Sequence, residues 1–134
     1  GTCGTCHNVV GAGSDAIPAS QRDIGIGGHG VTLGGPPPAA DLPVFRLTCN
    51  EGTALFNPSV VTTNDPGKAL ITGLCADIGS RTVPGLRGLA SHEPFFSDGS
   101  AATLRALVEV YNTRFAIALT EEEKCDLVNF LASL

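Results

Sequence analysis

The residues best suited to chemistry stand at the start of the chain. Cys3 and Cys6 are separated by two residues, and His7 follows directly. This C-x-x-C-H spacing is typical of covalent attachment of a c-type haem. Each thiol can add to one haem vinyl group, and the adjacent imidazole can ligate the iron from the proximal side. We therefore expect one covalently bound haem c, attached through Cys3 and Cys6 and ligated by His7.

Other uses of this cysteine pair fit the sequence less well. A zinc site would need a second C-x-x-C or an H-x-x-x-H, and neither follows. A thioredoxin-like redox pair would follow a strand of a βαβ unit, but Gly1 and Thr2 alone precede Cys3. The glycines of residues 23–30 do not have the spacing of a dinucleotide-binding or phosphate-binding loop.

Length, charge and hydropathy limit the class of protein that carries this motif. The 134 residues suffice for a single domain, residues 1–134, and the short leader before Cys3 suggests a piece excised from a longer chain. The net charge of −5, with eight Lys and Arg, argues against nucleic acid as a partner. No apolar run approaches the roughly 20 residues that would span a bilayer.

Glycine and proline divide the chain into two parts. All 17 Gly and all nine Pro lie at or before Gly99. We expect the first part to form long loops around the prosthetic group, with extended segments at 44–48 and 59–63 and a short helix within 66–75. The tail predicts two helices, one capped by Ser100 and one beginning with a capping box at Thr120. Their predicted apolar faces are Leu104, Leu107, Val108 and Tyr111, and Leu127, Val128, Leu131 and Leu134.

Three stretches of the chain then suggest a family. They read RTVPGLRGLA at 81–90, EPFFSDGSAATL at 93–104 and LTEEEKCDLVNFLASL at 119–134. Together with C-x-x-C-H, these resemble the C-terminal haem domain of the di-haem cytochrome c peroxidase superfamily. The resemblance implies a mainly α, cytochrome c-like helical haem domain, with long Gly/Pro-rich loops and little or no sheet. The superfamily includes peroxidases, cofactor-maturing enzymes, rubber oxygenases and electron-transfer cytochromes.

The resemblance also implies which residues surround the haem. Arginines of the first stretch would pair with propionate carboxylates, and apolar residues of the first two stretches would line the ring. On this basis the predicted haem-binding residues are Arg81, Pro84, Arg87, Phe95 and Phe96, with Val83, Leu86 and Leu89 as further lining residues.

The second iron ligand is left open by the sequence. Where some family members carry a distal Met this chain has Phe96, it contains no Met at all, and the neighbouring family His is Ser97. His/Met ligation is therefore excluded. We favour His92 over His29 as distal ligand, while water, an open site, Tyr111 or a ligand from another chain remain alternatives.

Two main functions follow from these features. In the first, which we favour, a six-coordinate bis-His haem transfers electrons to a redox partner protein or a neighbouring haem domain, and no residue is catalytic. In the second, the domain belongs to a cytochrome c peroxidase-like enzyme with an open or exchangeable distal site, where His92 and Glu93 act as an acid–base pair. A structural module that uses haem for assembly is a third, weaker hypothesis, and the oligomeric state is left open.

The remaining cysteines are Cys49, Cys75 and Cys125. Because c-type haem is attached outside the bacterial inner membrane, we expect a periplasmic or extracellular location in which disulfides persist. We favour Cys49–Cys75, since these residues flank the variable middle loop and Cys125 lies on a helix expected to pack in the core. Pairing of Cys125 with Cys75 or with Cys49 stays open.

Overall fold

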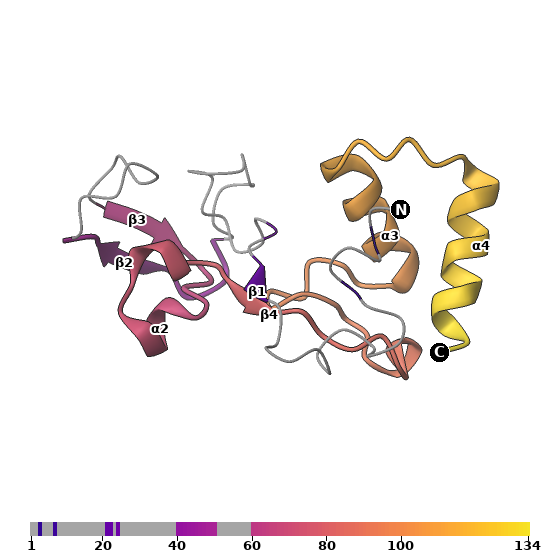
Figure 1. Ribbon diagram of the computed structural model, residues 1–134. Coiled ribbons are helices and arrows are strands. Elements are labelled where there is room, and N and C mark those ends of the chain that lie inside the picture. The colour runs from indigo at the N-terminus through magenta and orange to yellow at the C-terminus, as the bar shows by residue number, and fades with distance from the viewer. Residues whose placement is uncertain (1–2, 4–6, 8–20, 23, 25–39, 51–59) are drawn as a thin grey trace. The chain divides into compact units, whose positions relative to one another are not determined.

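The computed structural model describes Cys3, His7, Gln21, Arg22, Ile24, residues 40–50 and residues 60–134. The chain divides into two compact units. One, here called the sheet unit, comprises residues 16–83, and the other, the helical unit, comprises residues 1–15 and 84–134. Figure 1 shows the described elements of both units, and each unit is treated by itself below.

The sheet unit contains two antiparallel strand pairs. Strand β2 (Phe45–Thr48) pairs with β3 (Val60–Thr63), and the short β1 (Gln21–Arg22) pairs with β4 (Arg81–Thr82). β-Branched residues fill β3 and favour the extended backbone. Burial alternates along β3 as its pleat requires, because Val61 and Thr63 are buried while Thr62 is exposed. Strands β2 and β3 confirm the extended segments expected from the sequence.

The expectation of a mainly α fold with little or no sheet is wrong. The described residues form three α-helices together with these two two-stranded sheets. The physical reason is that the extended segments pair with one another, so their backbone groups are satisfied by ladders rather than left as loops.

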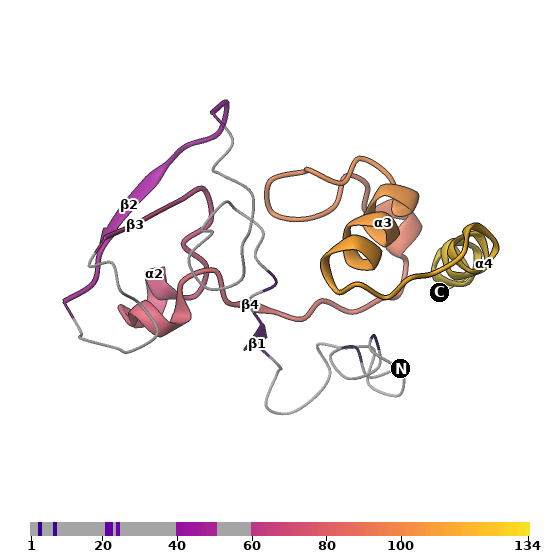
Figure 2. The ribbon, with the colours of Figure 1, turned by 90° about the horizontal axis from the view of Figure 1, so that it is seen from above.

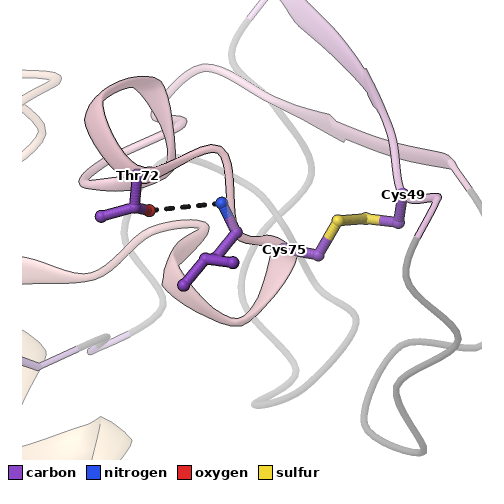
Figure 3. Close-up of a disulfide and its surroundings, with 4 residues drawn as sticks. Cys49, Thr72 and Cys75 are labelled. Carbon is purple, nitrogen blue, oxygen red and sulfur yellow. Dashed lines mark hydrogen bonds between the residues drawn. A yellow bond between two sulfur atoms is a disulfide. The ribbon is translucent and has the colours of Figure 1, made fainter.

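A disulfide joins the β2–β3 pair to the segment that follows it. Helix α2 (Ala69–Thr72) lies within the predicted range 66–75, and the 3₁₀ turn η1 (Cys75–Asp77) comes next. Cys75 is bonded to Cys49, with Cα atoms 5.8 Å apart (Figure 3). Both cysteines pack with Val61 and Ile78 in a small buried cluster. The same figure shows the Leu74 amide donating to the Thr72 hydroxyl at 3.3 Å, which fixes the turn between α2 and η1.

A second link in the sheet unit is ionic. The Asp65 carboxylate is buried, accepts a hydrogen bond from the Gly67 amide at 2.9 Å, and binds the Arg81 guanidinium through both of its oxygens. Gly67 has φ of +59°, and a Cβ there would lie 2.7 Å from the Ser80 carbonyl oxygen. The backbone at Gly67 therefore lies against the backbone of Gly79 and Ser80, with no room for a side chain between them.

The helical unit is built from η2 (Leu89–Ser91), α3 (Leu104–Arg114) and α4 (Glu121–Ala132). Helices α3 and α4 lie side by side in both Figure 1 and Figure 2. Their core is a buried cluster with half-buried residues packed around it. The buried members are Leu89, Phe95, Ala101 and Leu104, and the surrounding residues are Leu86, Phe96, Ala106, Leu107, Val128 and Leu131.

The helix starts test the predicted caps. Thr120 and Glu123 form the expected capping box, with side chain and backbone bonded reciprocally. The first cap is different, because Thr103 rather than Ser100 accepts from the Ala106 amide. Ser100 lies in a preceding turn, where its amide donates to the Asp98 carboxylate at 3.0 Å. The predicted stripe of α4 is also less complete than expected, since Leu134 is exposed.

A charged network joins α3 to α4. The Lys124 side chain is buried and binds Glu109 at 2.6 Å and Glu121 at 2.9 Å. Arg105 binds Glu121 and donates to the Cys125 sulfur at 3.2 Å. Cys125 is exposed, which corrects its expected place in the core, and it is not part of the disulfide.

Candidate functional site

His7 has surroundings unlike those of an ordinary surface side chain. Its amide donates to the Cys3 carbonyl at 2.9 Å, so the two residues belong to one turn. The residue is half-buried, and its Nδ1 atom is buried without a hydrogen-bond partner among the described residues. A buried polar atom without a partner is rare, because losing water without compensation is costly. A ligand that binds the imidazole would remove this cost.

Burial also sets the charge state of His7. Desolvation lowers the pKa of the imidazole below its ordinary value, while a hydrogen bond with the Pro84 backbone acts in the opposite direction. The net result favours the neutral ring, which is the form that ligates metals. Pro84, predicted near the haem, is thus placed beside His7.

The two thiols of the motif differ in how far they can be described. Cys3 carries an exposed thiol that is not in a disulfide, as an attachment point requires. Cys6 lies outside the described residues, as does His29. The expected disulfide, Cys49–Cys75, is the one present in the structure. Cys3 takes no part in it.

Four predicted lining residues come together in one core. Leu89 and Phe95 are buried in the helical-unit cluster, and Leu86 and Phe96 pack against it. Phe96 has φ of +67°, a backbone conformation that bulky residues seldom adopt. The centroid of its ring lies 6.1 Å from that of the Tyr111 ring. Val83 is buried too, but it belongs to the sheet unit.

His92 is exposed and directly follows η2. Its amide donates to the Leu89 carbonyl at 3.0 Å, which fixes the backbone, whereas its imidazole has no partner among the described residues. His92 and His7 belong to the same compact unit.

Glu93, which the peroxidase-like hypothesis pairs with His92, has a hydrogen-bond partner at the start of α3. Its Oε1 atom accepts a hydrogen bond from the Leu104 amide, 2.9 Å away, at the start of α3. Negative charge is favourable at a helix N-terminus because the first amides point toward it. The carboxylate therefore serves α3. Sequence reasoning missed this contact because eleven residues separate the two partners.

The predicted arginines are placed differently from each other. Arg81 is engaged by buried Asp65 in the sheet unit, so its guanidinium already has a carboxylate partner. Arg87 is exposed in the helical unit and has no ion-pair partner among the described residues. Of the two, Arg87 has the guanidinium available for a carboxylate of a bound group.

Comparisons with known protein families, with curated proteins and with solved structures found no match for this chain. Within the part of the chain that the structure describes, no helix is long and apolar enough to cross a membrane. Nor do the described residues contain a cluster of three or more His, Cys, Asp or Glu side chains suited to hold a metal ion.

Proposed function

We propose that this protein is a c-type cytochrome that carries one covalently bound haem c and transfers electrons. The observation that carries the proposal is the C-x-x-C-H motif, whose histidine has a buried nitrogen without a hydrogen-bond partner among the described residues. A bound haem supplies an iron that takes up and releases one electron between its ferric and ferrous states. Because such haem is attached outside the bacterial inner membrane, the protein would act in the periplasm or outside the cell.

The residues of this chain have distinct parts in the proposal. Cys3 and Cys6 would form the thioether bonds, and His7 would ligate the iron in its neutral form. Leu86, Phe95 and Phe96 would exclude water from the ring, and Arg87 would pair with a propionate.

His92 is the proposed second ligand. Its imidazole is exposed and has no partner among the described residues, and its backbone is fixed in the unit that contains His7. If His7 and His92 both ligate the iron, the bound haem would supply electron transfer with a redox partner protein or a second haem domain, and these two side chains would leave no ligand position for a substrate. The Glu93 carboxylate accepts a hydrogen bond from the start of α3, which weighs against its use as the acid–base partner of His92 in the peroxidase-like alternative.

Covalent attachment is the first test. The protein is expressed in a periplasm that contains the haem-attachment machinery, and haem that survives denaturation is measured by its absorbance. We expect one haem per chain, and we expect none to remain bound after denaturation in the Cys3→Ala/Cys6→Ala variant. Cys125→Ser is the matched control and should keep the haem. Absence of haem from the unmodified protein would overturn the proposal.

The ferric spectrum then separates the two functions. A low-spin spectrum that becomes high-spin in His92→Ala, and returns to low-spin when imidazole is added, would support electron transfer through bis-His haem. A high-spin wild-type protein that reacts with peroxide would favour the enzyme instead.

A further inference from the structure

The backbone of His92 is held from both sides. On one side, its amide bonds to Leu89, whose side chain is buried in the helical-unit core. On the other side, Glu93 accepts from the Leu104 amide at 2.9 Å. Since Leu104 is the first residue of α3, the Glu93 carboxylate ties the residue next to His92 to the start of that helix.

The rest of the loop is closed without Glu93. Phe95 and Ala101 pair through their backbones, and the Gly99 amide donates to the Phe96 carbonyl at 3.3 Å. Helix α3 also has its own cap, because the Thr103 hydroxyl accepts from the Ala106 amide at 3.1 Å. The distinct contribution of Glu93 is therefore the tether between His92 and α3, rather than the capping of α3 alone.

We propose that Glu93 is a positioning residue that holds His92 in place as an iron ligand. This inference rests on the proposed function. A ligand on a fixed backbone loses little conformational freedom when it binds, so the bond to the iron forms more completely. Without the tether, the segment between η2 and Pro94 gains freedom, and His92 would leave the iron more often.

Two variants separate positioning from helix stability. Glu93→Ala removes the tether, whereas Thr103→Ala removes the other cap of α3 and leaves the tether intact. We expect the ratio of low-spin to high-spin ferric haem to fall on the order of tenfold in Glu93→Ala, the factor by which loss of a helix cap shifts a local equilibrium. Thr103→Ala should lower the denaturation midpoint about as much as Glu93→Ala does. Its ferric spectrum should match that of the wild-type protein. Glu93→Gln keeps a carbonyl oxygen as acceptor and should restore most of the low-spin form.

Each alternative outcome has a definite meaning. An unchanged spectrum in Glu93→Ala, or equal spectral changes in Glu93→Ala and Thr103→Ala, would overturn the positioning role while leaving the haem assignment intact. If the wild-type protein is low-spin and the His92→Ala variant is low-spin as well, His92 is not the iron ligand. The positioning role of Glu93 is then overturned too. If the wild-type protein carries no haem, the proposed function itself has failed.

Discussion

Buried carboxylates are costly unless they are paired, and Asp65 shows how this chain satisfies one. Its side chain is 4 % exposed, while that of its partner Arg81 is 52 % exposed, so the charge of the pair reaches solvent through the arginine. The Gly67 amide supplies a further donor. Asp65 thus fixes the point at which the chain enters α2 to the strand β4 that follows it.

Removal of Arg81 should therefore cost more than removal of an ordinary surface arginine. We expect Arg81→Ala to lower the free energy of unfolding by roughly 2 kcal/mol, because the buried Asp65 carboxylate loses the guanidinium that both of its oxygens bind. Arg87→Ala, at an exposed arginine outside any described ion pair, should change it by less than about 0.5 kcal/mol. Urea denaturation measures both, and equal losses would refute this account of Asp65.

Single residues also mark the limit of what the sequence could predict about the site. The role proposed for His7 rests on local spacing, and the structure places Cys3 and His7 in one turn. The partners of Arg81 and Glu93 are tertiary contacts between segments sixteen and eleven residues apart. No spacing rule links such residues, so the propionate role suggested for Arg81 and the acid–base role suggested for Glu93 could not be judged before the structure was known.

Helices α3 and α4 are joined by charge as well as by apolar packing. Lys124 is buried between Glu109 and Glu121, and the contact with Lys124 is the main cause that lowers the pKa of each carboxyl below its ordinary value of 4.5. The same contacts raise the pKa of Lys124. The charged forms of Glu109, Glu121 and Lys124 are thus all favoured.

This network predicts an acid-sensitive helix pair. A carboxyl with a lowered pKa in the folded state stabilises the fold at pH values above its ordinary pKa, and that contribution is lost as the pH falls through the lowered value. We expect the free energy of unfolding to decline from about pH 5 downward. Glu121→Gln should flatten this decline, whereas the adjacent exposed Glu122→Gln should not. Denaturant titrations at several pH values test this, and identical profiles for the two variants would contradict it.

Element starts show why part of the fold was predictable. The capping box at Thr120 is a local pattern, and it places the start of α4 correctly. The start of α3 depends on the Phe95–Ala101 bridge and on the turn at Ser100, which delay the helix to Leu104. The two extended segments were identifiable from β-branched residues, but their mutual pairing is a tertiary event, which is why the mainly α expectation failed.

At the scale of the whole molecule, the Cys49–Cys75 disulfide and the proposed haem motif belong to different compact units. Cys49 and Cys75 lie in the sheet unit, whereas Cys3 and His7 lie in the helical unit. The bridge spans a sequence separation of 26 residues, so it restricts the unfolded chain substantially.

Loss of the disulfide should therefore reduce stability without altering the proposed haem site. We expect Cys49→Ser/Cys75→Ser to lower the free energy of unfolding by about 3 kcal/mol, chiefly by freeing the unfolded chain. The ferric haem spectrum should stay the same. Cys125→Ser, at a cysteine outside the bridge, serves as the control. A spectral change on removal of the bridge would show that the sheet unit contributes to the haem environment.

The close approach at Gly67 has a consequence for how this sequence can vary. A side chain at position 67 would meet backbone atoms that cannot move aside, in addition to adopting a positive φ. Gly73 ends α2 with φ of +70°, and a Cβ added there would meet no atom within 4 Å, so asparagine is an acceptable replacement. Among natural or selected variants of this protein, position 67 should remain glycine while position 73 drifts. This contrast would show that the close backbone approach beside the Asp65–Arg81 ion pair must be kept for the sheet unit to fold.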